Sequence, residues 1–216
     1  MKYFDVIIVG GGAAGFFAAI NIAEQYPDLT VAILEKSKEV LSKVKVSGGG
    51  RCNVTHAEFI PQELVKNYPR GEKELLGPFH TFMTGDTMEW FEKRGVPLKI
   101  EDDGRIFPES NSSQTIIDCF LYEAKKLGVE VIKQQVVTEF NKDEFWQVKT
   151  KADQFSCEKL IIATGSSTKI WEQLDADTLC DRAVIIAGNP DSCIEALKKH
   201  EKAGVDPVLI SMQTET

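Results

Sequence analysis

The sequence is poor in the residues that bind metal ions or build disulfide frameworks. It has three histidines, which lie far apart: His56, His80 and His200. Its five cysteines are scattered and include no C-x-x-C pair: Cys52, Cys119, Cys157, Cys180 and Cys193. These spacings predict neither a zinc site nor a set of disulfides, so no metal is expected. Separate reduced thiols are typical of a cytoplasmic protein, and we expect that location.

The sequence also lacks an excess of positive charge. Lysine and arginine number 25 against 33 aspartates and glutamates, a formal net charge of -8. Such a balance gives no general attraction for nucleic acid, so a nucleic-acid partner is not expected, although a local basic patch is not excluded. The expected partner is a small-molecule cofactor, and the sequence does not indicate an oligomeric state.

One apolar stretch, residues 4–23, resembles a membrane span in its hydropathy. Asp5 and Asn21 are its only strongly polar members. Four glycines fall within six of its positions, and no basic flank precedes it as in a signal peptide. A buried parallel strand followed by a buried helix has the same hydropathy. We therefore expect no membrane segment.

The same stretch contains a glycine motif between an expected strand and an expected helix. The apolar run from Val6 to Val9 precedes Gly10, Gly12 and Gly15, which fit the spacing G-x-G-x-x-G. Glu35 follows Gly15 by twenty positions, at the end of a second apolar run. Strand, glycine turn, helix, strand and acid in this order are typical of a dinucleotide-binding βαβ unit.

The chemistry of such a unit explains each residue type. The first glycine permits a tight turn, the second lets a pyrophosphate approach the backbone, and the third lets the helix pack on the strand. Free N–H groups at the helix start, around Ala13 and Ala14, favour phosphates. Glu35 is expected to accept hydrogen bonds from a ribose hydroxyl and to disfavour a 2′-phosphate. The alternative is a glycine-rich turn that binds nothing.

A second glycine cluster lies from Ser47 to Thr55, with the sequence SGGGRCNVT. Three successive glycines are favoured only where φ is positive or where another group lies against the backbone. They indicate either a second contact with the same ligand or a flexible surface loop. Arg51 could pair with a phosphate or a flavin carbonyl, and Asn53 could form hydrogen bonds. Cys52 is a weak candidate for catalysis or redox exchange, the alternative being a structural thiol.

The middle of the chain predicts helices and a hairpin. Residues 86–94 are expected to form a helix with Asp86 as its N-cap. A longer amphipathic helix is expected to start at Ser112 and to end at Gly128. The turn 101–104 predicts a hairpin between 97–100 and 105–108. Its two aspartates could be imagined as a catalytic carboxylate pair, but a solvated turn is the favoured interpretation.

Several short strands are expected after that helix. Residues 129–132 and 136–140 are strand-like, and residues 145–150 and 155–157 alternate as in a small antiparallel crossover sheet. Residues 159–165 predict a separate buried strand that ends in Ala-Thr-Gly. A domain built only of regular βα repeats would lack this inserted sheet, which favours FAD over NAD.

Taken together, these segments resemble the BaiN-like flavoproteins, which are NAD(P)/FAD-dependent oxidoreductases. The resemblance rests on GGGAAG, LEK, SGGGRCN, VPLKIEDDGRIFPESNSSQTIID and LIIATGSS, and it covers about residues 1–174. It implies an α/β fold: a glutathione-reductase-type, FAD-binding Rossmann-like domain with a small antiparallel crossover sheet. It also implies FAD as cofactor and NAD(P)H as a candidate electron donor.

The resemblance assigns the cofactor-binding residues to four segments. The first glycine loop and the acidic strand end supply Gly10, Gly12, Ala13, Ala14, Gly15, Glu35, Lys36 and Lys43. The second glycine cluster supplies Ser47, Gly48, Gly49, Gly50, Arg51, Cys52 and Asn53. Val137 is expected near the adenine, and Ala163, Thr164 and Gly165 are expected near the pyrophosphate.

Beyond about residue 174 the chain departs from that family. Residues 175–216 predict one further βαβ unit, with a strand at 183–187 and Pro190 in a first helical turn. This segment resembles a late βα stretch of luciferase-like flavin monooxygenases, but one βα unit cannot form their barrel. We therefore expect an FAD domain over 1–174, truncated relative to its family, and a βαβ segment of different origin whose strands pair with the edge of the sheet.

The sequence leaves three functions open. The leading one is an FAD-binding flavoprotein of oxidoreductase type, in which hydride passes from a reduced nicotinamide to flavin and on to an unknown acceptor. The second is a non-catalytic nucleotide-binding fragment without the flavin-covering half. The third is a flavin-dependent RNA uridine reductase, because one branch of the resembling family is thought to reduce a uridine in ribosomal RNA.

Overall fold

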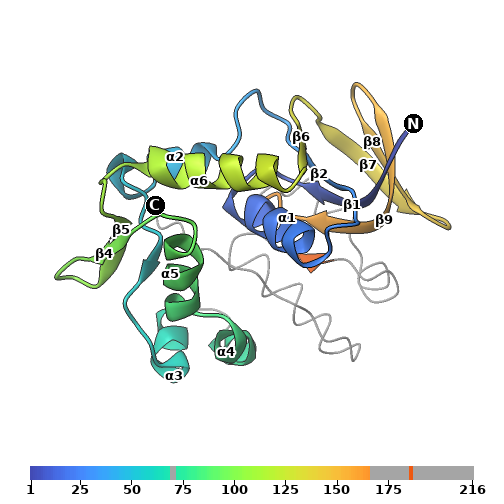
Figure 1. Cartoon of the computed structure of the whole chain (residues 1–216). Coiled ribbons are helices and arrows are strands. Elements are labelled where there is room, and N and C mark those ends of the chain that lie inside the picture. Colours follow the sequence, from blue (N-terminus) through green and yellow to red (C-terminus); the bar gives the residue numbers. More distant parts are fainter. Residues whose placement is uncertain (69–71, 166–184, 187–216) are drawn as a thin grey trace.

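The computed structural model describes residues 1–68, 72–165 and 185–186, which form two sheets and their helices (Figure 1). The larger sheet has seven strands and the smaller one has three. Five described strands of the larger sheet are parallel: β6 (Glu130–Ile132), β2 (Val31–Leu34), β1 (Lys2–Val9) and β9 (Gln154–Ile162) lie in that order, and β10 (Ile185–Ile186) also pairs with β9. The expected Rossmann-like α/β class is confirmed.

Strand β9 joins the parallel and antiparallel parts of the sheet. On one side it pairs with β1 along residues 155–162. On the other side, its first residues pair antiparallel with β8 (Trp146–Thr150), which in turn pairs with β7 (Val137–Lys142). Its last residues pair in parallel with β10 (Ile185–Ile186). The antiparallel crossover sheet is therefore continuous with the parallel one.

The expectation of two separate strands at 155–157 and 159–165 is wrong, because both belong to β9. Glu158 and Lys159 are exposed and interrupt the apolar pattern, but β1 hydrogen-bonds along both sides of them. Backbone pairing thus carries the strand through two polar positions. The strand expected at 183–187 is present as β10 where the structure describes it, and it does pair with β9. The other predictions for residues 175–216 lie outside the described residues.

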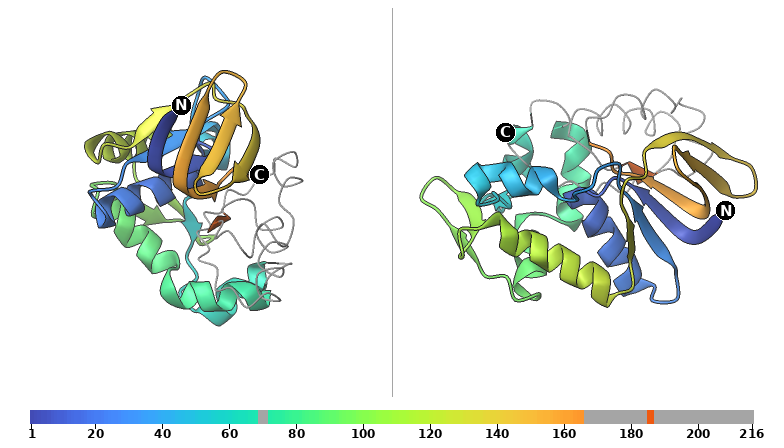
Figure 2. Two further views of the ribbon diagram at one scale, coloured as in Figure 1. Left: turned by 90° about the vertical axis from the view of Figure 1, so that its right-hand side faces the viewer. Right: turned by 90° about the horizontal axis from the view of Figure 1, so that it is seen from above.

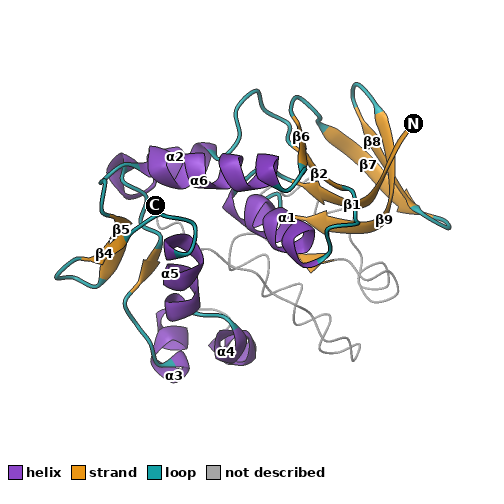
Figure 3. Ribbon diagram, viewed as in Figure 1, coloured by secondary structure: helices purple, strands orange, loops and turns teal. Residues whose placement is uncertain are grey.

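Helices α1 (Ala13–Gln25) and α6 (Ser113–Lys126) pack against the same face of the sheet (Figure 3). Strand β1 and helix α1 account for the apolar stretch that resembled a membrane span. No helix in the described ranges is long and apolar enough to cross a membrane. For α6, both predicted ends are confirmed: the Ser112 hydroxyl accepts the N–H of Gln114 at 3.3 Å, and Gly128 has φ +73°.

A second lobe follows α2 (Ser42–Gly50) in the chain. Its sheet has the order β3 (Thr55–His56), β5 (Arg105–Pro108) and β4 (Leu98–Ile100), and β4 and β5 form the predicted hairpin. Its helices are α3 (Pro61–Leu64), η1 (Val65–Asn67), α4 (Glu72–Thr81) and α5 (Thr84–Glu92). Figures 1 and 2 show α3 and α4 at the opposite end of the molecule from β7 and β8.

Helix α5 begins earlier than predicted. Met83 is its N-cap residue, and the Asp86 carboxylate, at the third helical position, accepts the Met83 N–H at 2.9 Å. The aspartate therefore satisfies the cap from inside the helix, whereas we had expected it to be the cap itself. Phe91 and Trp90 of α5 pack on Phe120 of α6, with ring centroids 5.6 Å apart in both pairs. This aromatic contact joins the second lobe to the core under the large sheet.

Candidate functional site

The first glycine loop connects β1 to α1 and is held by close backbone contacts. Gly10 has φ +119°, and a Cβ atom there would lie 2.3 Å from the carbonyl oxygen of Ala163. A Cβ atom on Gly15 would lie 2.0 Å from the carbonyl oxygen of Gly10. Real Cβ atoms do not come so close to a backbone oxygen, so both positions require glycine. These two residues bring the ends of β1 and β9 and the start of α1 together.

Gly12 differs from its two neighbours because it faces open space. No atom lies within 4 Å of a Cβ atom built there, and its φ of −89° is accessible to any residue. Gly12 is the N-cap of α1, no side chain caps the helix, and its first turn holds no acidic residue. The first N–H groups of a helix lack intrahelical partners and attract anions. Ala13 and Ala14, in the first turn, thus border a site suited to a phosphate.

Glu35 at the end of β2 is tied to the first glycine loop. Its carboxylate accepts the Gly11 N–H and the Ser37 N–H, each at 2.8 Å. A carboxylate has about four acceptor positions, so two remain for the hydroxyls of a ribose. Gly11 is a site residue that the motif did not reveal, because G-x-G-x-x-G treats it as any residue. A Cβ atom there would lie 3.0 Å from the Glu35 Cβ.

The second glycine cluster is a defined turn and not a flexible loop. It forms the end of α2 (Ser42–Gly50), where the helix is kinked at Ser47. The next three residues have positive φ values: 54° for Gly48, 67° for Gly49 and 86° for Gly50. A Cβ atom on Gly48 would lie 2.8 Å from both the Asn53 nitrogen and the Phe107 ring. Gly49 has no neighbour within 4 Å of its Cβ position and is open to a ligand.

Arg51 has an acidic partner that the sequence did not reveal, and its contact with a phosphate or a flavin carbonyl stays a prediction. Its Nη1 atom donates to Glu101 Oε1 at 2.6 Å. Its guanidinium lies 3.9 Å from the centroid of the Phe107 ring, a cation–π contact. Arg51 therefore fastens the glycine turn to the hairpin of β4 and β5.

Cys52 is buried and its thiol is not activated. The residue is 5% exposed and has φ +63°. Burial raises the pKa of the thiol, and a hydrogen bond with Ser47 opposes this only in part. Because the thiolate is the reactive species, a raised pKa disfavours a nucleophilic or redox role at neutral pH.

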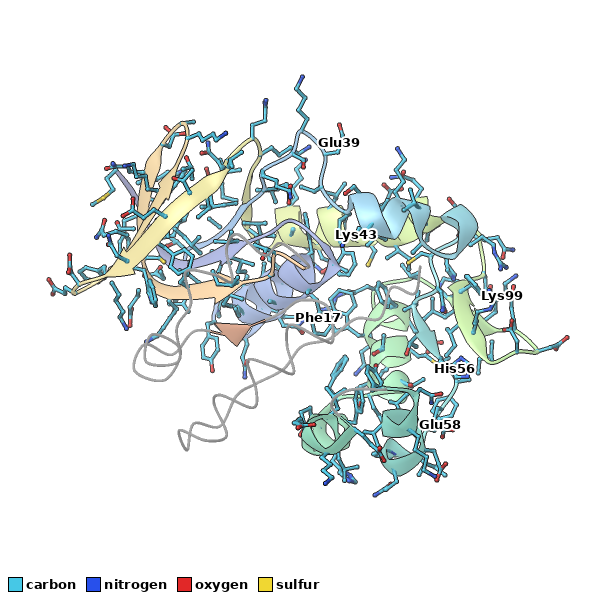
Figure 4. All side chains as sticks on the ribbon, turned by 180° about the vertical axis from the view of Figure 1, so that it is seen from behind. Phe17, Glu39, Lys43, His56, Glu58 and Lys99 are labelled. Atoms are coloured by element: carbon cyan, nitrogen blue, oxygen red, sulfur yellow. The ribbon has the colours of Figure 1, made fainter. Side chains whose placement is uncertain are left out.

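The loop after β9 adds the third segment of the site. The Ala163 N–H donates to the Val9 carbonyl at 2.8 Å, so this loop leaves the sheet beside the glycine loop. The Oγ1 atom of Thr164 is buried and has no hydrogen-bond partner in the part of the chain that the structure describes. Gly165 has φ +62°, and Lys43 Nζ lies 3.7 Å from its Cβ position. Figure 4 shows Lys43 at the junction between α1 and α2.

Among the described residues, two buried polar atoms of the predicted site residues have no hydrogen-bond partner: Thr164 Oγ1 and Asn53 Oδ1. An unpaired buried polar group is costly and is usually satisfied by water or a ligand. Together with the open space at Gly12 and the ammonium of Lys43, they fit a ligand that carries phosphates and several hydrogen-bonding groups. The residues therefore fit an adenine dinucleotide such as FAD.

Two other expected contacts, Lys36 and Val137, lie at the Glu35 end of the site. The Gln135 N–H donates to the Glu35 carbonyl at 2.8 Å, which places the start of β7 beside β2. Val137 itself pairs with Thr150 inside the sheet, and Lys36 is exposed. Most predicted residues thus gather at the carboxyl ends of β1, β2 and β9, where open α/β sheets bind ligands.

This fold and site define a Rossmann-like protein of the dinucleotide-binding class. The chain belongs to the family described as the HI0933-like protein Rossmann domain, whose model matches residues 4–180. This match confirms the expected membership of the FAD-dependent oxidoreductase superfamily.

Three curated relatives illustrate the family. The chain is 29% identical over 198 residues to the "Ribosomal RNA dihydrouridine synthase" of Escherichia coli and 27% identical over 169 residues to that of Haemophilus influenzae. These matches cover 86% and 76% of this chain, and 48% and 41% of the relatives. The chain is also 26% identical to the "3-dehydro-bile acid delta(4,6)-reductase" of Clostridium scindens, over 73% of this chain and 38% of the relative. The chain thus spans about half the length of the curated relatives it matches, or less.

Solved structures show the same fold. A 3-ketosteroid-delta4-(5alpha)-dehydrogenase from Rhodococcus jostii matches with a TM-score of 0.56 at 16% identity, over 76% of this chain and 46% of its own. A flavocytochrome c3 fumarate reductase matches with a TM-score of 0.56 at 19% identity, over 76% of this chain and 34% of its own. At these identities the likeness concerns the fold alone.

Proposed function

We propose that the chain binds FAD and acts as a flavoprotein oxidoreductase, in which a reduced nicotinamide gives hydride to the flavin and an acceptor then receives it. The observation that carries the proposal is the open space at Gly12. It lies at the uncapped start of α1, between the loop of Glu35 and the loop of Thr164. Gly10 and Gly15 need to be glycine for packing, whereas Gly12 does not, and the lack of a side chain at Gly12 leaves the start of α1 open to a ligand.

In this proposal, different residues of the chain bind different parts of the cofactor. The N–H groups at Ala13 and Ala14 face the pyrophosphate, and the Lys43 ammonium neutralises part of its charge. Glu35 accepts from the adenosine ribose while it holds the Gly11 N–H, so the loop is in place before the ligand arrives. The buried side-chain oxygens of Thr164 and Asn53 form hydrogen bonds with the cofactor.

The redox chemistry comes from the cofactor. A bound flavin supplies a ring that accepts a hydride and can pass two electrons to a second substrate. The protein's part is to bind and orient that ring and to limit the access of water. We assign no side chain to proton transfer, and Cys52 is assigned a structural role.

The proposal is tested on the purified full chain by its visible spectrum before and after NADH or NADPH is added without oxygen. A bound yellow flavin that bleaches on addition of either donor is the expected result. A colourless protein that binds ADP but not FAD would support the non-catalytic nucleotide-binding module. Bound flavin that neither donor bleaches would refute the nicotinamide step while leaving cofactor binding intact.

An RNA base is a second candidate for the acceptor. Two relatives carry the name ribosomal RNA dihydrouridine synthase, and exposed lysines without ion pairs lie beside the candidate site. The test is to incubate reduced, flavin-loaded chain with ribosomal RNA and to measure dihydrouridine by mass spectrometry. Absence of the product with flavin fully reduced would rule this acceptor out.

A further inference from the structure

A short segment of this acidic protein is strongly basic. Residues 36–45, with the sequence KSKEVLSKVK, hold four lysines and one glutamate, within a chain whose formal net charge is -8. The segment runs from the end of β2 into α2. It therefore starts immediately after Glu35 and ends immediately before the second glycine cluster.

The lysines of this segment are exposed and have no acidic partner. All four are exposed, and within the described part of the chain none forms an ion pair: Lys36, Lys38, Lys43 and Lys45. Lys133 joins them, because the neighbouring Gln134 N–H donates to the Ser37 carbonyl at 3.2 Å. It too is exposed and has no ion pair among the described residues. We call these five residues the lysine edge.

The lysine edge stands on a fixed backbone. The Ser113 hydroxyl of α6 donates to the Lys45 carbonyl at 2.9 Å, and the Lys45 N–H donates to the Leu41 carbonyl at 3.0 Å. Leu41 and Val44 are buried in the core. The loop before α2 and the turn after β6 lie along the same side of the molecule (Figures 1 and 4). The positive charges are thus presented together by an ordered surface.

We propose that the lysine edge is a binding surface for the phosphate backbone of a nucleic acid. A chain of phosphates offers one negative charge after another, and exposed ammonium groups contact such a chain without a shaped pocket. Lysine acts there as a flexible point charge. The acidic net charge of the chain predicts no binding of nucleic acid. The lysine edge can nevertheless bind it, because its positive charge is local.

The geometry favours a polymer over a small anion. A site for a nucleotide brings its charges together around one partly buried position, as Lys43 does beside Gly165. Lys38, Lys45 and Lys133 are instead spread over a loop, a helix and a turn. A lipid surface is a weaker match, because residues 36–45 expose no large apolar side chain, the next residue, Val46, is the one beside them that is exposed, and no aromatic residue accompanies it.

The position of the lysine edge relates it to the candidate cofactor site. Lys36 follows Glu35 directly and Lys43 lies beside Gly165, so the lysine edge borders the candidate cofactor site. A nucleic acid bound by the lysine edge would therefore lie next to the cofactor. The surface proposal concerns binding only, so it stands independently of the flavin chemistry proposed above.

The test compares two triple variants of the full chain in binding to a fluorescein-labelled RNA hairpin, measured by anisotropy over a series of salt concentrations. Lys38→Gln, Lys45→Gln and Lys133→Gln remove charge from the lysine edge and spare the residues of the cofactor site. The matched control, Lys73→Gln, Lys125→Gln and Lys151→Gln, removes the same charge from exposed positions elsewhere. Flavin content is measured in each sample, so a loss of cofactor is seen separately.

The unmodified chain is expected to bind the hairpin more weakly as salt rises. The lysine-edge variant should bind about tenfold more weakly or worse, with the magnitude of the salt slope lower by about 2, while the control stays within about twofold. Equal losses in both variants would overturn the proposal, as would no binding by the unmodified chain. Lysine-dependent binding to phosphatidylserine vesicles without binding to RNA would also overturn it in favour of a lipid surface.

Discussion

At the scale of single residues, the Glu35 carboxylate has two roles. It orients the Gly11 N–H and is positioned to accept from a ribose. Glu35→Ala should weaken FAD binding by about 1–3 kcal/mol, roughly 5- to 150-fold, because a charged acceptor is lost. Isothermal titration with FAD measures this change.

The matched control for Glu35 is the carboxylate four residues further on. Glu39 is exposed and forms no hydrogen bond or ion pair with other described residues, and Figure 4 labels it beside the site. Glu39→Ala should leave the affinity for FAD within about twofold. Equal effects of the two substitutions would show that Glu35 acts only through the overall charge.

Also at this scale, the Cys52 thiol should be slow to react. Burial raises its pKa, so the thiolate fraction at any pH between neutral and the usual thiol range is lower than in the unfolded chain. In a variant that keeps only this cysteine, modification by iodoacetamide should be slower in the folded chain than in urea, with a midpoint at higher pH. A folded thiol that reacts as fast as the unfolded one would contradict the structural role.

At the scale of elements, the Arg51–Glu101 pair couples the second glycine turn to the hairpin of β4 and β5. Both side chains are about two-thirds buried or more, and Arg51 Nη1 lies 2.6 Å from Glu101 Oε1. Double-mutant cycles with Arg51→Ala and Glu101→Ala should give a coupling free energy of about 0.5–1 kcal/mol in urea unfolding. Additive effects of the two substitutions would show that the elements are held by Phe107 and the backbone alone.

Several elements were predictable because local sequence alone determines them. The unit of β1, α1 and β2 follows from two apolar runs and the glycine spacing, and α6 follows from its period and its two caps. The start of α5 was misplaced, because Asp86 satisfies the cap from the third helical position. The unity of β9 was missed because its pairing partner, β1, lies about 150 residues earlier in the chain.

For the site, the sequence predicted residue types better than their partners. Glu35 lies against the first glycine loop as the spacing required, and the two loops after β1 and β9 meet. The Gly11 contact was missed because a backbone N–H leaves no trace in a motif. The pairing of Arg51 with Glu101 was missed because the two residues are fifty positions apart and Glu101 belongs to a turn.

At the scale of the whole molecule, two lobes meet around the glycine loops. The aromatic contacts between α5 and α6 and the Arg51–Glu101 pair hold the second lobe beside the carboxyl ends of the strands. The buried Thr164 and Asn53 oxygens come from two segments, the loop after β9 and the turn that precedes the second lobe. The proposed site therefore depends on segments that are far apart in the chain.

The central claim is that the space at Gly12 holds the pyrophosphate of FAD, and a titration of three chains with FAD tests it most directly. Gly12→Val should abolish binding while the free energy of unfolding changes by no more than about 1 kcal/mol, since the position is open. Gly10→Ala should instead lower stability by several kcal/mol through its contact with Ala163. Undiminished FAD binding by a folded Gly12→Val chain would contradict the account.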